Sequence, residues 1–263
     1  MKRVIDKHRF YSVERVLFPD REIPDSQCDL IRYMRFSQAQ PSLSVGIQDV
    51  AYTYLTDLNA SDEELAASFS KTVRYEIRRS EKDPLTISYY TAQALLEQQD
   101  ILKDFTQTYL HFCELCGNEE LKSVLDEALI HTYIQNNCFL LSSAAFPKGK
   151  VYHAYFFSDD SACLWYSASD FRNQDVDRNL AGRANRRLHL EDMKYLREQG
   201  IRCYDWGNVS TRNNVNPNGI DQFKASFGGS YSEMYSYTLG NTLWGKLLLL
   251  GRKLLTRHGA QEQ

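Results

Sequence analysis

Residues 179–185, rich in small side chains, have the composition of an anion-binding turn. They follow a predicted strand and lead into a predicted helix that begins at about Arg183. Small residues let the backbone approach a ligand, and the free N–H groups and dipole at a helix N-terminus attract phosphate. We expect this turn to hold the pyrophosphate of coenzyme A or a terminal phosphate of RNA, unless Gly182 is only a turn glycine. The expected cofactor-binding residues are Asn179, Gly182, Arg183, Ala184 and Asn185.

A carboxylate stands near the end of the next predicted strand, residues 201–206. Open α/β sheets place their ligand crevice at the carboxyl ends of strands, so Asp205 could orient or deprotonate an acceptor amine. The alternative is a structural cap, because aspartates often bind nearby backbone. His153 and His189 have no serine or cysteine nucleophile in a recognisable setting, and we interpret both as structural.

Basic side chains line one face of a predicted amphipathic helix that begins with a capping box at Ser61 and Glu64. They are Lys71, Arg74, Arg78 and Lys82. Arg74 and Arg78 are candidate substrate-binding residues that would contact a phosphate of the donor or the acceptor. A basic stripe is also typical of a solvated helix face, and that alternative stays open.

Periodicity and turn residues predict the elements that position these side chains. From residue 85 the order is strand, helix, helix, three antiparallel strands, helix, strand, short helix and strand. We expect an α/β (α+β) fold with a mixed central sheet and flanking helices, and the 162–168 and 201–206 strands should be parallel and splayed apart. The predicted segments are a β-rich N-terminal extension (1–60), a connecting basic amphipathic helix (61–84), a catalytic domain (85–240) and a C-terminal amphipathic helix and tail (241–263).

The C-terminal half also resembles a known family. The blocks 182–185, 200–207, 219–224 and 227–229 resemble, in order, the motifs of Fem-type aminoacyltransferases of bacterial peptidoglycan synthesis and of their single-domain acetyltransferase relatives. The resemblance extends from about residue 50 to 240, and the element order is that of the GNAT acyltransferase superfamily. It implies a GNAT fold, in which residues 1–60 could represent part of a second GNAT half.

The resemblance places Phe223 and Lys224 at the centre of acyl transfer. An ammonium group there would stabilise the oxyanion of a tetrahedral intermediate. Phe223 stands near the position where many GNAT enzymes have a tyrosine as general acid, so that Lys224 or Tyr204 would have to supply the proton. The expected catalytic residues are therefore Lys224, Asp205, Tyr204 and Phe223.

We expect an acyltransferase that moves an acyl or aminoacyl group from an activated donor to an amine of a small-molecule or lipid-linked cell-envelope precursor. No permanently bound cofactor is expected. With a formal net charge of -3, one complete GNAT domain and no helical arm, we favour acyl-coenzyme A as co-substrate over aminoacyl-tRNA. A tRNA-dependent aminoacyltransferase of peptidoglycan is one alternative, and a non-catalytic GNAT-like binding module at the membrane is another.

The six cysteines and the absence of a secretory signal favour a reducing cytoplasmic location with free thiols. Cys113 and Cys116 lack the second ligand pair of a closed zinc site, so we expect no metal. The leucines and Trp244 of a C-terminal helix, with cations opposite and only Leu249 out of place, are typical of a peripheral anchor at the inner face of the membrane. The alternative is that this helix packs on the protein itself.

Overall fold

The computed structural model describes residues 1–23, 25–117, 122–209 and 219–259, with side chains as far as residue 254. Contacts group the chain into two units. Unit 1 contains Met1–Thr53 and Tyr231–Gln263, and unit 2 contains Tyr54–Ser230. The domain boundaries predicted at residues 60, 84 and 240 remain predictions.

Unit 1 is built on a sheet in the order β1-β2-β3-β10-β4. The bounds are β1 Lys2–Lys7, β2 Ser12–Leu17, β3 Leu30–Phe36, β4 Ile47–Asp57 and β10 Ser230–Gly240, with a 3-10 turn at Pro41–Leu43 and helix α9 at Leu243–Gly259. Strands β2 and β3 are parallel, whereas β10 pairs antiparallel with β3. The rings of Tyr33, Phe36 and Tyr237 pack in the core of this unit. The short N-terminal strands predicted from alternating apolar residues are confirmed.

Unit 2 contains the end of β4 and a sheet in the order β4-β9-β8-β7-β6-β5. The bounds are β5 Thr86–Thr91, β6 Phe139–Phe146, β7 Gly149–Phe157, β8 Ser161–Ser169 and β9 Cys203–Asp205. Strands β5 to β8 are antiparallel neighbours, β9 is parallel to β8, and β4 is antiparallel to β9. The predicted mixed sheet with an antiparallel meander is confirmed.

The parallel pair β8–β9 is short. Its register runs from Ser161 opposite Cys203 to Cys163 opposite Asp205. Strand β8 then continues to Ser169, whereas β9 ends at Asp205. The carboxyl end of β9 is therefore a point where two parallel strands stop pairing, which is where ligands bind in open α/β sheets.

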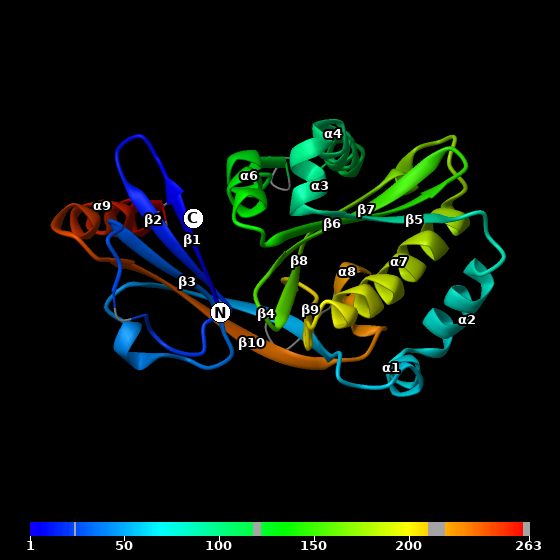
Figure 1. Ribbon diagram of the computed structural model, residues 1–263, viewed down its shortest axis with the longest axis horizontal. Helices are drawn as coiled ribbons and strands as arrows, with labels where there is room; N and C mark the ends of the chain where they lie inside the picture. The colour runs from blue at the N-terminus through cyan, green and yellow to red at the C-terminus, as the bar shows by residue number, and fades with distance from the viewer. Residues whose placement is uncertain (24, 118–121, 210–218, 260–263) are drawn as a thin grey trace. The chain divides into compact units, whose positions relative to one another are not determined.

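Helices cover both faces of the unit 2 sheet (Figure 1). Helix α7 packs on β6 and β7 through a cluster that includes Ala184, Leu188 and Val151, and α2 lies beside α7. Helices α3, α4 and α6 lie on the opposite face. The helix bounds are α1 Asp62–Ser68, α2 Lys71–Ser80, α3 Ala92–Glu97, α4 Gln99–Cys116, α6 Glu127–Gln135, α7 Arg178–Glu198 and α8 Gly219–Ala225, with a 3-10 turn at Asp170–Arg172.

The predicted connecting helix is two helices. Its capping box is confirmed, because Ser61 Oγ accepts from the Glu64 N–H and Glu64 Oε2 accepts from the Ser61 N–H. The expectation of one continuous helix is wrong, since α1 ends before Phe69 and α2 begins after Ser70. Ser70 Oγ accepts a hydrogen bond from the Val73 N–H, and this second N-cap starts a new helix. Within the described residues, no helix combines the length and the apolar composition needed to cross a bilayer.

Candidate active site

Helix α7 begins at Arg178, whereas we predicted its start near Arg183. Its N-cap is Asp177, whose Oδ1 accepts hydrogen bonds from the N–H groups of Asn179 (2.8 Å) and Leu180 (3.2 Å). An aspartate in this position satisfies the first N–H groups of a helix and carries a charge that its dipole favours. The predicted turn is therefore wrong, because residues 179–182 are helical, and the N-terminus of α7 already holds a carboxylate.

The predicted cofactor-binding residues lie in the first turns of α7, where three of them contact other parts of unit 2. The Nε and Nη2 groups of Arg183 donate to the two carboxylate oxygens of Asp83 (2.6 and 2.9 Å), and this pairing raises the pKa of Arg183. Ala184 is buried against the sheet, and Asn185 bonds to His153. A cofactor-binding role for these residues, as for Asn179 and Gly182, remains a prediction.

Asp205 is fully buried at the end of β9. Its Oδ1 accepts a hydrogen bond from the Gly207 N–H (2.9 Å). Gly207 has a φ of +70°, and a Cβ atom there would lie 2.3 Å from the carbonyl oxygen of Leu164 in β8, so a side chain would not fit. Asp205 thus caps the turn that holds the chain against β8, which is the structural role we had left open. A role as base remains a prediction.

Tyr204 is also fully buried, and its hydroxyl joins two other elements. It lies 2.9 Å from the hydroxyl of Tyr155 in β7 and 2.9 Å from Nδ1 of His189 in α7. Burial raises the pKa of Tyr204 well above its ordinary value, so the phenol stays protonated at neutral pH. Tyr204 therefore acts in this structure as a neutral hydrogen-bonding group.

The same chain of hydrogen bonds continues to a buried carboxylate. Oδ2 of Asp192 accepts from the Tyr155 hydroxyl (2.6 Å) and lies 2.7 Å from Nδ1 of His153, whose Nε2 lies 2.8 Å from Oδ1 of Asn185. The rings of His153 and His189 stack with their centroids 4.0 Å apart. The buried polar network thus consists of Asn185, His153, Asp192, Tyr155, Tyr204 and His189.

This network was not predicted from the sequence, although the spacing of its residues carries a signal. Asn185, His189 and Asp192 recur at the spacing of one helix face, and His153 and Tyr155 alternate on one face of a strand. Ligand atoms of His153, His189 and Asp192 lie within 4.8 Å of one another, which is close enough for a metal ion. Hydrogen bonds already engage both nitrogens of His153 and Nδ1 of His189, so the observed geometry is that of a hydrogen-bonded network.

Phe223 and Lys224 lie on helix α8, next to this network. The centroid of the Phe223 ring is 5.5 Å from that of the His189 ring. Burial, together with nearby positive charges, lowers the pKa of His189 well below its ordinary value. Nζ of Lys224 donates to the carbonyl oxygen of Asn208 (2.7 Å) and lies 3.8 Å from the position that a Cβ atom of Gly207 would occupy. Lys224 is thereby held where β9 ends.

The structure brings the four predicted catalytic residues into one region of unit 2. Tyr204 and Phe223 meet through His189, and Asp205 and Lys224 meet at the Gly207 turn. Arg74 and Arg78, the predicted substrate-binding residues, lie on α2 and line a hollow of about 370 Å³ with Lys71 and Tyr75. None of the four catalytic residues is among the described residues that line that hollow, and the binding role of Arg74 and Arg78 remains a prediction.

Comparison with known proteins identifies the fold. No protein-family model matches the sequence, and no curated protein matches it. The structure of FemX superposes over 92% of this chain and 85% of its own with a TM-score of 0.58, at 14% sequence identity. The chain shares the fold of FemX. The C-terminal domain of a protein described as a lysylphosphatidylglycerol synthetase, from Agrobacterium fabrum, is also similar, with a TM-score of 0.50 and 15% identity over 86% of this chain and 72% of that one.

The FemX-like fold confirms the fold class expected from the sequence, including the parallel strands that stop pairing at Asp205. At this level of identity the similarity shows the fold alone. The assignment of chemistry therefore depends on the side chains around Lys224.

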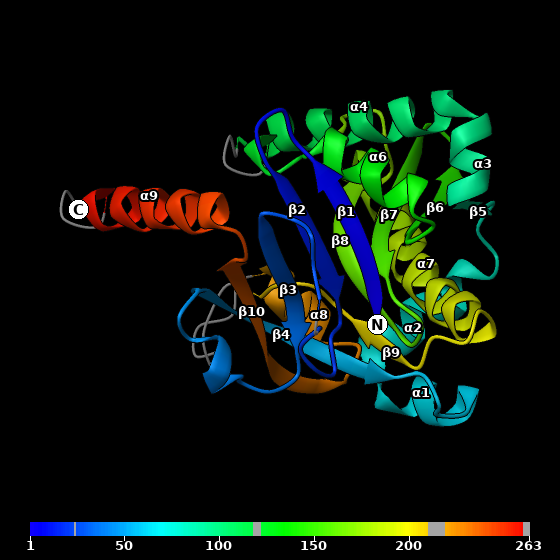
Figure 2. The ribbon, with the colours of Figure 1, turned by 60° about the vertical axis from the view of Figure 1, so that its left-hand side comes forward.

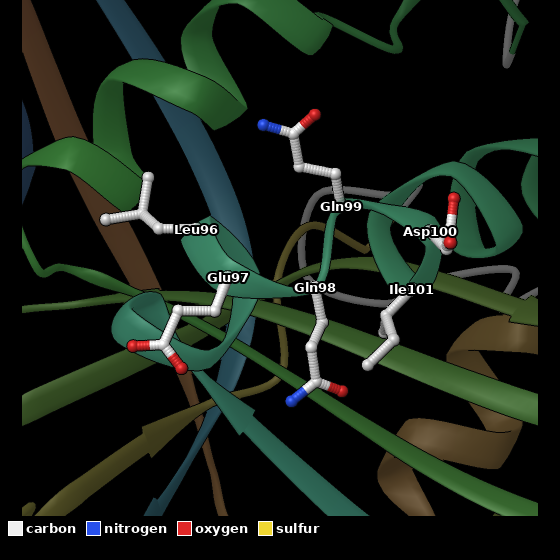
Figure 3. A pocket seen from close by; sticks show the side chains of 6 residues that line it. All are labelled: Leu96, Glu97, Gln98, Gln99, Asp100 and Ile101. Atoms are coloured by element: carbon white, nitrogen blue, oxygen red, sulfur yellow. The ribbon is translucent and has the colours of Figure 1, made fainter.

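A second hollow of the described residues lies elsewhere and carries no comparable set of groups. It measures about 480 Å³ and is lined by the consecutive residues Leu96, Glu97, Gln98, Gln99, Asp100 and Ile101, at the junction of α3 and α4. Figure 3 shows their side chains spreading in several directions from one stretch of the chain. Catalysis needs polar groups that converge on one point, so we place no active site there.

Proposed function

We propose that the protein is an acyltransferase that moves an acyl or aminoacyl group from an activated donor to an amine. One observation carries this proposal. Nζ of Lys224 is held by Asn208 beside Gly207, at the end of the parallel β8–β9 pair, in a chain that shares the fold of FemX. A cation in that place suits a reaction in which negative charge develops on a carbonyl oxygen.

The transfer proceeds directly between the two substrates. The lone pair of the acceptor nitrogen forms the new C–N bond, and the carbonyl π electrons move to oxygen, where the Lys224 ammonium stabilises the negative charge. When the carbonyl re-forms, the C–S or C–O bond to the donor breaks. The departing thiolate or alkoxide takes up one proton, and the acceptor nitrogen loses one, so the protons balance without a covalent enzyme intermediate.

The buried polar network has a positioning role in this proposal. His189 packs against Phe223, the residue before Lys224, and is itself held by the Tyr204 hydroxyl. A hydrogen-bonded residue behind the reacting groups restricts their motion, and small displacements at a reaction centre slow catalysis strongly. Tyr204 therefore contributes through His189 rather than through ionisation.

The acceptor that we propose is a cell-envelope precursor, and acyl-coenzyme A is the donor favoured by the sequence. Support for an envelope substrate comes from the similarity to the Agrobacterium fabrum domain, since that protein is described by the name of an aminoacylated phospholipid. That name also supports an aminoacyl donor, which keeps aminoacyl-tRNA as the second candidate. A comparison of the two donors in one assay decides between them.

A contact with the membrane surface is part of the proposal, and helix α9 would provide it. Leu249 and Gly245 are buried and face the rest of unit 1. A Cβ atom on Gly245 would lie 1.8 Å from the Asp29 carbonyl oxygen. Leu249 was the leucine that did not fit the predicted apolar face, and its burial explains why.

The opposite side of α9 is exposed and apolar. Figure 2 shows the helix leading away from the end of β10. The exposed fractions are 82% for Leu243, 48% for Trp244, 60% for Leu247, 55% for Leu250 and 51% for Leu254. The side chains of Leu255 and Arg257, further along the same helix, lie outside the described residues. Exposed leucines and a tryptophan beside cations suit an anionic lipid surface.

Lys224→Ala tests the proposed activity. We expect it to lower transfer to a lysine-containing peptide about a hundredfold, as loss of one preorganised oxyanion partner typically does. Each donor, acetyl-coenzyme A and charged tRNA, is assayed separately. Lys103→Ala, an exposed position on α4, is the matched control and should transfer normally. If Lys224→Ala stays within about twofold of the wild type, or neither donor supports transfer, the proposal is wrong.

A further inference from the structure

Arg186 differs from the arginines on either side of it in α7. Arg183 donates to both carboxylate oxygens of Asp83, and Nη2 of Arg187 lies 2.9 Å from Oε1 of Glu191. Among the described residues, no carboxylate lies within ion-pair distance of Arg186. A cation that is half removed from water is normally paired with an anion. The surroundings of Arg186 therefore suit an anionic ligand.

The position of the Arg186 guanidinium is defined by two contacts. Nη1 donates to the carbonyl oxygen of Gly182 (2.9 Å), and Cζ lies 5.3 Å from the centroid of the Phe223 ring. Nε is enclosed and has no hydrogen-bond partner among the described residues. An enclosed donor without an acceptor is unfavourable, and an oxyanion would remove that cost.

A second cation, Lys224, directly follows Phe223 on helix α8. The positive charges of Lys224 and Arg186 both contribute to the lowered pKa of His189. Burial lowers the pKa of Arg186, and the negative charge of Glu76 in α2 acts in the opposite direction. The ring of Phe223 thus has a cation on its own helix and another across from it on α7.

We propose that Arg186 binds a phosphate group of a substrate beside Phe223. Arg183 shows in the same helix how the Nε–Nη2 edge of an arginine holds an oxyanion through two parallel hydrogen bonds. In this proposal the long Arg186 side chain turns so that the same edge meets the ligand. The inference rests on the proposed function, since the phosphate belongs to the donor, either coenzyme A or the terminal nucleotide of an RNA.

Isothermal titration of the full chain with coenzyme A and, separately, with adenosine 5′-monophosphate tests the subsite. We expect Arg186→Gln to weaken at least one of the two about tenfold, as loss of a charge-assisted pair does. The ligand affected identifies the source of the phosphate. Arg187→Gln, next to it but already paired, is the matched control and should bind as the wild type does. The subsite is excluded if the wild type binds neither ligand, if Arg186→Gln binds both normally, or if the two variants weaken equally.

Glu76→Gln provides a test that does not depend on the folding of the Arg186 variant. Removal of the nearby negative charge should tighten phosphate binding about twofold at low salt, and unchanged or weaker binding contradicts the subsite. Normal binding by Arg186→Gln together with Lys224-dependent transfer would reject the subsite and keep the acyltransferase. Arg186-dependent binding without any transfer would keep the subsite and reject the acyltransferase.

Discussion

Tyr204→Phe separates a positioning role from a purely structural one. The substitution removes a buried hydroxyl that bonds to Tyr155 and to His189, each at 2.9 Å. Tyr155 keeps its bond to Asp192, whereas Nδ1 of His189 loses the Tyr204 hydroxyl as its partner. Two lost hydrogen bonds and one unsatisfied buried group amount to about 2–3 kcal/mol. For a chain of this size we expect the melting temperature to fall by roughly 5–10 °C.

Tyr166→Phe is the matched control. The Tyr166 hydroxyl is also buried, lies outside the network and makes two hydrogen bonds. It donates to the Val124 carbonyl oxygen (2.9 Å) and accepts from the Asp126 N–H (3.3 Å). We expect a similar loss of stability in both variants, measured by thermal unfolding, but a loss of transfer only in Tyr204→Phe. Equal transfer rates per folded molecule in the two variants would refute the positioning role.

Three further predictions concern stability and location. Burial holds His189 neutral, so at low pH the unfolded chain binds a proton that the folded chain excludes. The free energy of unfolding should therefore fall as the pH drops below about 6.5. In a series of melting temperatures measured against pH, this fall should be less steep for His189→Gln. Arg183→Gln should cost about 2 kcal/mol in denaturant unfolding, since it breaks a charged, two-bond pair with Asp83; an unchanged midpoint contradicts a structural role. Leu247→Glu should abolish sedimentation with anionic liposomes at an unchanged melting temperature, whereas Leu249→Ala should lower that temperature. Normal sedimentation of Leu247→Glu would exclude α9 as the lipid contact.

The charge distribution along α7 changes the interpretation of the whole site. Residues near the helix start were expected to bind an anion, yet Asp177 and Asp83 already provide carboxylates there. Arg186, for which the described residues provide no carboxylate partner, lies further along the helix, beside Phe223. An anionic group is therefore expected close to Phe223 and Lys224 and not at the N-terminus of α7.

The sequence by itself determined the elements whose signals are local. Apolar alternation between tight turns predicted the β6–β8 meander, the capping box at Ser61 predicted the start of α1, and the helix between two strands predicted that β8 and β9 are parallel. Such patterns act within a few residues or through the handedness of a crossover. Two local signals were misread, the caps Asp177 and Ser70.

Only the tertiary structure decided which side chains have partners. Whether Arg183 or Arg186 is available to a ligand depends on Asp83, which is far away in the sequence and reaches α7 because α2 packs beside it. The buried network likewise joins β7, β9 and α7, so the roles of His153 and His189 follow from the packing of a helix on a sheet. Periodicity defines which face of an element is buried. The partner that a buried polar group meets is set by long-range packing, which no single segment encodes.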